Sequence, residues 1–98
     1  MSIPLTIVAV IRALPGYEHD VEQALTDLVA PTLAEPGCLQ YDLHQDLELP
    51  GVFLFYENWA SKEAWLMHMA SDHLSGMKAA TQGKTADTVI HQMEKMSR

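Results

Sequence analysis

The stretch Val52-Phe-Leu-Phe-Tyr-Glu-Asn-Trp59 indicates how this chain folds. It is rich in aromatic and aliphatic residues, which favour a strand. Side chains alternate between the two sides of a strand, and here both alternating sets contain large apolar residues. One face holds Phe53, Phe55, Glu57 and Trp59, and the other holds Val52, Leu54, Tyr56 and Asn58. The stretch therefore predicts a strand that needs cover on both sides.

A hairpin is predicted immediately before this strand. Residues 47–51 end in Pro50-Gly51, a dipeptide that marks a turn. Before them, residues 38–46 alternate apolar and polar side chains with period two, as a half-buried strand does. The two strands should therefore pair as neighbours.

The remaining elements extend outward from this hairpin. Residues 3–11 are rich in β-branched side chains and predict a first strand, and helical periodicity follows over about residues 17–33, where Pro31 should kink or end the last turn. Ser61 is a candidate N-cap for a helix to about residue 70, and Ser71 or Asp72 restarts a short helix to about residue 81. A last strand is expected over about residues 88–94. The order β-α-β-β-α-β predicts one α+β domain over residues 1–98, of the ferredoxin-like type.

A sheet of this order has helices on one face only. The residues expected on its other face include the apolar side chains Val8, Val10, Val52 and Leu54. An uncovered apolar sheet face is a typical association surface. The pattern therefore predicts a homodimer formed face to face, around an apolar pocket.

The composition excludes several classes of partner. The formal net charge is −7, from 13 acids and 6 Lys and Arg, whereas nucleic acids and anionic membranes attract basic patches. This argues against both, and weakly against a strongly phosphorylated substrate. Cys38 is the single cysteine, so no intramolecular disulfide forms and the cytoplasm is the expected compartment. No apolar run approaches the length of a membrane span, and residues 3–11 lack the basic start of a signal peptide.

His68 is the foremost candidate for chemistry. It lies three residues after Trp65 on one helix face, which should point toward the sheet. Histidine is the side chain whose ordinary pKa lies near neutrality, so it suits a general base. The spacing of His68 and His73 does not place two ligands on one face of one helix, so no metal site is expected. Asn58, Trp59 and Tyr56 end the strand beside this helix, where their polar ends could orient a ligand.

Three motifs resemble the antibiotic biosynthesis monooxygenase family, in particular its small members similar to quinol monooxygenases. They are Glu35-Pro-Gly-Cys-Leu-Gln-Tyr41, Phe55-Tyr-Glu-Asn-Trp59, and the run from Glu63-Ala64 through His68 to Ser71-Asp-His-Leu74. Together with the element order, the resemblance covers nearly the whole chain. It implies a dimeric α+β barrel whose enzymes oxidise polycyclic or quinol-type substrates with molecular oxygen, many of them without metal, flavin or haem.

The resemblance also suggests roles for particular residues. Small members commonly carry the same residues at the positions of Trp59, His68 and His73, whereas Asn58 and Trp59 compare only loosely with the family's Asn and Trp active-site residues. The haem-degrading branch would need Trp at position 68 and His at position 78, where this chain has His68 and Lys78. A branch that isomerises or degrades a phosphorylated signalling sugar shares the His68 and His73 pattern.

The sequence therefore predicts a cofactor-independent monooxygenase for a small aromatic or quinol substrate. Its expected catalytic residues are His68, Asn58 and Trp59, with Tyr56, Trp65, His73 and Tyr41 binding the substrate. Two alternatives stay open: an isomerase of a small carbonyl or phosphorylated metabolite on the same scaffold, and a non-catalytic ligand-binding dimer.

Overall fold

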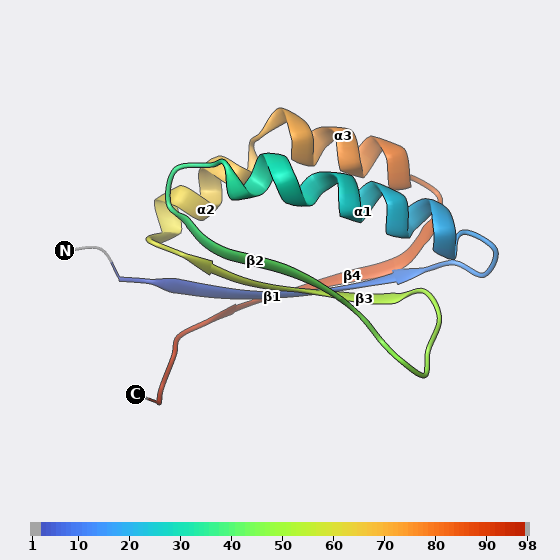
Figure 1. Ribbon diagram of the computed structural model, residues 1–98, viewed down its shortest axis with the longest axis horizontal. Helices are drawn as coiled ribbons and strands as arrows, with labels where there is room; N and C mark the ends of the chain where they lie inside the picture. Colours follow the sequence, from blue (N-terminus) through green and yellow to red (C-terminus); the bar gives the residue numbers. More distant parts are fainter. Residues whose placement is uncertain (1–2, 98) are drawn as a thin grey trace.

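The computed structural model describes residues 3–97 as four strands and three helices (Figure 1). In chain order the elements are β1 (Leu5–Ala13), α1 (Glu18–Leu33), β2 (Cys38–Gln45), β3 (Val52–Trp59), α2 (Lys62–Met69), α3 (Asp72–Thr81) and β4 (Thr85–Met93). The predicted restart of the helix after residue 70 is confirmed, with the Ser61 and Ser71 hydroxyls accepting the backbone N–H groups of Ala64 and Leu74.

The four strands form one antiparallel sheet in the order β2-β3-β1-β4. This is the ferredoxin-like α+β arrangement that the sequence predicted. Two strand boundaries differ from the expected ones. The first strand runs over Leu5–Ala13, and β4 begins at Thr85. A register shift between Arg12 and Ala13 lets Ala13 pair with Thr85, which lengthens both strands at this end.

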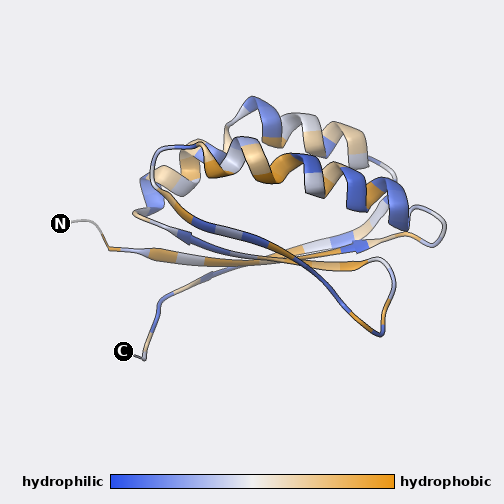
Figure 2. Ribbon diagram, in the orientation of Figure 1, coloured by the Kyte–Doolittle hydropathy of each residue, from blue (hydrophilic) through white to orange (hydrophobic). Residues whose placement is uncertain are grey.

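The core lies between the sheet and the helices. Val21, Leu25 and Leu28 on α1 are fully buried, because their spacing of four and three residues places them on one helix face. They pack in the same cluster as Ile7, Ile11, Phe53 and Phe55 from the sheet. Figure 2 shows hydrophobic segments along α1 and along the strands beneath it. Pro31 lies inside α1, which continues two residues further and ends at Leu33.

The other face of the sheet is bare. All three helices lie on one side of it in Figure 1. Alternation places Val8, Val10 and Leu54 on the uncovered side, each only partly exposed, and Val10 pairs directly with Leu54 and with Val89. Val89 and Met93 are 45% and 46% exposed. An apolar surface in the middle of this face is therefore open to solvent in the single chain.

None of the helices within residues 3–97 combines the length and the apolar character needed to cross a membrane.

Candidate functional site

A cavity of about 470 Å³ lies between the sheet and the helices α2 and α3. Its walls are mainly apolar and include Ile7 and Phe55 from the sheet, Leu74 and Met77 from α3, and the aromatic rings of Tyr41 and Trp65. His68 and Glu57 bring ionisable side chains into this lining. An apolar cavity with a few convergent polar groups is the usual form of a small-molecule site.

His68 reaches this cavity from α2. Trp65 and His68 are the buried residues of that short helix, three positions apart on one face. The His68 ring lies 5.5 Å from the Tyr41 ring and 4.9 Å from the Trp59 ring, measured between centroids. His68 is only 2% exposed, and these two aromatic rings form part of its surroundings.

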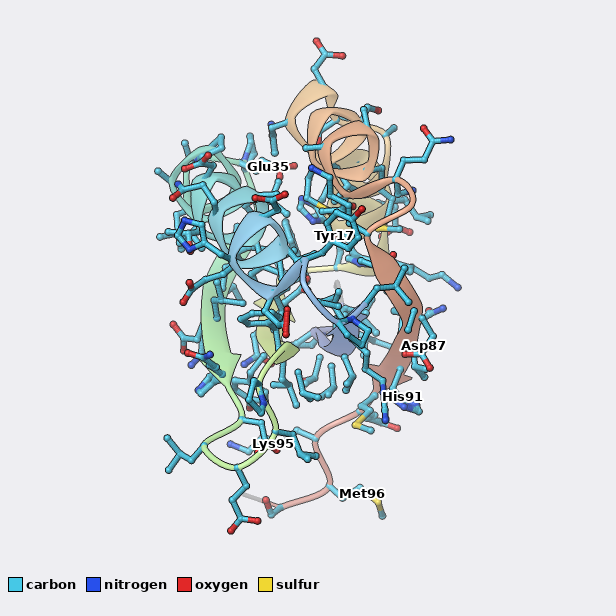
Figure 3. All side chains as sticks on the ribbon, turned by 90° about the vertical axis from the view of Figure 1, so that its right-hand side faces the viewer. Tyr17, Glu35, Asp87, His91, Lys95 and Met96 are labelled. Carbon is cyan, nitrogen blue, oxygen red and sulfur yellow. The ribbon has the colours of Figure 1, made fainter. Side chains whose placement is uncertain are left out.

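Glu35 fixes the orientation of His68. The Glu35 Oε2 atom lies 2.6 Å from Nδ1 of His68 and 2.8 Å from Nε2 of His73. A carboxylate can only accept hydrogen bonds, so the hydrogen of a neutral His68 sits on Nδ1 and the lone pair on Nε2. Figure 3 views the molecule along the helices and shows Glu35 between α1 and α3.

Burial lowers the pKa of His68, because the charged imidazolium loses its water, and the proximity of Glu35 opposes this effect. Burial therefore favours the neutral imidazole, the form in which a histidine acts as a general base. His73 is more accessible, with a side chain 26% exposed, and contacts Glu35 from the first turn of α3.

The sequence argument about the spacing of His68 and His73 needs correction. It considered two ligands on one helix only, whereas the two helices that meet at residues 70–71, as predicted, bring the two rings to one carboxylate. Glu35, His68 and His73 therefore form a group whose potential ligand atoms all lie within 4.8 Å of one another. Both rings contact the same carboxylate oxygen at hydrogen-bond lengths, so a metal ion would have to displace these contacts.

Gly37 allows the turn that carries Glu35 to approach α2. Its φ is +84°, and a Cβ built there would lie 2.6 Å from Cβ of Ala64. The backbone oxygen of Gly37 also accepts the N–H of Ala60 at 2.8 Å. This close approach sets the position of Glu35 relative to His68.

Gly37→Ala is therefore expected to lower the free energy of unfolding by about 2–4 kcal/mol, through left-handed backbone strain plus overpacking. Gly83→Ala is the matched control, because Gly83 has a φ of +75° with no atom within 4 Å of the added Cβ. Strain alone should cost that variant about 1 kcal/mol. Urea denaturation of both variants measures the difference, and equal losses would contradict the close-packing argument.

Glu57 is the second ionisable group of the cavity. It follows Phe55 and precedes Trp59 on the helix-facing side of β3, and it is 3% exposed. Burial raises its pKa to about 7, although the hydrogen bond from Trp59 Nε1 at 2.9 Å works in the opposite direction and the charge of Glu35 adds to the rise. Burial likewise raises the pKa of Tyr41, the residue opposite Glu57 on β2.

The residues predicted for the site fall into two groups. His68, Tyr41 and Trp65 line the cavity. Trp59 packs against His68, and His73 contacts Glu35, but neither Trp59 nor His73 belongs to the cavity lining. Asn58 and Tyr56 do not join them, which corrects the prediction that they shape the pocket. Alternation along β3 turns both to the bare face, where Asn58 hydrogen-bonds Gln40 and Thr6 and Tyr56 is 39% exposed.

Sequence reasoning missed the roles of Glu35 and Glu57. Glu57 could have been identified from the sequence, since it is an acid on the same strand face as Phe53, Phe55 and Trp59, a face whose apolar residues predict burial. Glu35 carried no such signal, because it lies in a turn and meets His68 only through the tertiary fold.

Comparison with known proteins places this chain in a family. The family model described as antibiotic biosynthesis monooxygenase matches residues 4–80. The Mycobacterium tuberculosis protein named "Putative monooxygenase Rv0793" is 28% identical over 79 residues, which cover 81% of this chain and 77% of that protein.

Solved structures agree in fold over almost the whole length. The crystal structure of PA3566 from Pseudomonas aeruginosa superposes with a TM-score of 0.93 at 37% identity, covering 99% of this chain and 98% of that one. A "putative antibiotic biosynthesis monooxygenase" from Caulobacter crescentus gives a TM-score of 0.88 at 28% identity, covering 98% and 92% of the two chains. Since the family model spans well over half of the sequence and the neighbours share the entire fold, this chain belongs to the antibiotic biosynthesis monooxygenase family.

Proposed function

We propose that this protein is a monooxygenase that oxidises a small aromatic or quinol substrate with molecular oxygen, without a bound cofactor, and that His68 is its general base. The observation that carries the proposal is the buried His68, held by Glu35 through Nδ1 at the edge of an apolar cavity. Family membership and the name of the mycobacterial relative support the reaction class.

The proposed reaction requires a base and a pocket that excludes water. Removing a proton from an electron-rich phenol or quinol leaves an anion that can transfer an electron to oxygen. The net reaction adds one oxygen atom to the substrate as a carbonyl and releases the other as water. The apolar walls exclude water from the anion, and the rings of Tyr41 and Trp65 offer flat surfaces for an aromatic substrate.

Oxygen-electrode measurements across quinols and polyphenols, after treatment of the protein with a chelator, test this proposal. We expect uptake by the wild type and a fall of about 10²–10⁴-fold in His68→Ala, the usual contribution of a general base. His19→Ala is the control, because the His19 side chain on α1 is 86% exposed and lies outside the cavity lining.

Other outcomes would point to the alternatives. Uptake that His68→Ala leaves intact would contradict the role of His68, and turnover without oxygen would indicate an isomerase. Saturable binding without turnover would indicate a ligand-binding protein.

We also propose that two copies associate through their bare sheet faces. Val8, Val10 and Leu54 form the apolar centre of this face, and exposed Val89 and Met93 on β4 extend it. Covering apolar area of this kind stabilises an assembly by about 25 cal/mol per Å². A domain of this size, with a correspondingly small core, would gain much of its stability from such a contact.

A further inference from the structure

Glu57 occupies a position where the strand pattern requires an apolar residue. Its strand neighbours on the same face are Phe55 and Trp59, and its cross-strand partners are Ile7 and Tyr41, all of them buried. Acidic side chains are almost never fully buried unless they are paired. Glu57 nevertheless lines the cavity with 3% exposure.

Among residues 3–97, no Lys, Arg or His forms an ion pair with this carboxyl group. Within residues 3–97 the ion pairs involve other acids, and the hydrogen bond found for the Glu57 side chain is the one that Oε1 accepts from Trp59 Nε1. The titratable groups that influence Glu57 electrostatically are Cys38 and Tyr41 on β2 and Glu35 in the turn before β2, and His68 on α2 and the exposed Lys78 on α3 line the same cavity. A neutral carboxylic acid, with a proton available at Oε2, fits these surroundings better than a carboxylate.

We propose that Glu57 is a second acid–base residue of this cavity and delivers a proton to the peroxide anion formed from oxygen and substrate. This inference rests on the proposed monooxygenase function and assigns His68 and Glu57 to opposite proton transfers in one reaction. Two ionisable groups with different surroundings in one apolar site are a common basis for such a division.

The steps balance as follows. His68 Nε2 takes a proton from the substrate, and the resulting anion transfers an electron to oxygen; the two radicals combine through a new C–O bond into a peroxide anion. Glu57 Oε2 gives this anion a proton. The Glu57 carboxylate then removes the hydrogen left on that carbon, the carbonyl forms, the O–O bond breaks and hydroxide leaves. Hydroxide takes the proton from His68 and becomes water, so both residues return to their starting forms.

A measurement without substrate tests the availability of this proton. Because Trp59 Nε1 donates to Glu57, the indole ¹H–¹⁵N signal of Trp59 reports the ionisation of that carboxyl group. We expect this signal to titrate with a midpoint near pH 7 in the wild type and to stay flat in Glu57→Gln, with the Trp65 indole as internal reference. A flat Trp59 signal between pH 5 and pH 9 in the wild type would overturn the inference.

Thermal unfolding gives an independent readout with a defined sign. A raised pKa in the folded protein means that the stabilising contribution of protonated Glu57 is complete below the ordinary value of 4.5 and is lost as the pH rises through about 7. The Tm of Glu57→Gln minus the Tm of the wild type should therefore increase as the pH rises from 5 to 8. Glu63→Gln, an exposed change on α2, should follow the wild type throughout.

Product analysis with an active substrate separates this inference from the proposed function. Glu57→Gln should form at least about 10-fold less oxygenated product than the wild type and release more of the consumed oxygen as hydrogen peroxide. Product formation within twofold of wild type, while His68→Ala is inactive, would overturn the inference and leave the proposed function standing. If Glu57→Gln and His68→Ala both keep the activity of the wild type, the inference and the proposed role of His68 are overturned together.

Discussion

Glu35→Gln is expected to reduce turnover by about 10²–10³-fold while leaving the chain folded. The carboxylate of Glu35 keeps the hydrogen of His68 on Nδ1, 2.6 Å away, and leaves the lone pair on Nε2. A glutamine amide can donate to Nδ1 instead, which stabilises the other tautomer and removes the base from the cavity side. Replacing a carboxylate that orients a catalytic histidine by its amide has large effects of this kind in other enzymes.

Three measurements distinguish this positioning role from a general loss of structure. The ¹⁵N shifts of the His68 ring should report the change of tautomer, and kcat should fall more than KM rises. Glu35 opposes the lowering of the His68 pKa, so its removal should move the acid limb of the kcat profile to lower pH. Glu48→Gln, in the exposed hairpin loop, is the control. Turnover within threefold of wild type in Glu35→Gln would contradict the role of Glu35.

The fold was accessible from the sequence because its signals are local. Period-two alternation in residues 38–46, turn residues such as Pro50-Gly51, and N-cap serines at positions 61 and 71 each act over a few residues. These signals determine the order of elements, and for the order β-α-β-β-α-β few topologies are available. The strand ends were less accessible, since the pairing of Ala13 with Thr85 depends on a register shift.

The site was only partly accessible because its central contact is not local. Glu35 and His68 are 33 positions apart, and they meet because Gly37 lets the turn before β2 pack against Ala64 on α2. Helical spacing correctly placed Trp65 and His68 on one helix face, but it gave no information about Glu35, the hydrogen-bond partner of His68. Asn58 shows the reverse error. It neighbours Trp59 in the sequence, but the pleat of β3 sends the two side chains to opposite faces.

Both acids of the site are largely shielded from solvent, and they differ in how the cost of burial is offset. The Glu35 carboxyl oxygen Oε2 is within hydrogen-bond distance of two imidazoles, so polar partners satisfy it there. Glu57 has one indole donor and no ion-pair partner among the described residues, so the proton itself is the compensation. This difference assigns an orienting role to one acid and a proton-transfer role to the other.

Val10→Asp is expected to convert the proposed dimer into a single chain. Val10 lies at the middle of the bare face, paired with Leu54 on one side and Val89 on the other. A carboxylate there is solvated in the monomer but buried without a partner in the dimer, which costs about 3–5 kcal/mol and raises the dimer Kd by about 10²–10⁴-fold. Val10→Thr keeps the shape and the β-propensity of valine and should stay dimeric. Sedimentation velocity of the wild type and both variants measures the effect. A wild-type chain that sediments as a monomer at micromolar concentration, or an aspartate variant that remains dimeric, would contradict association through this face.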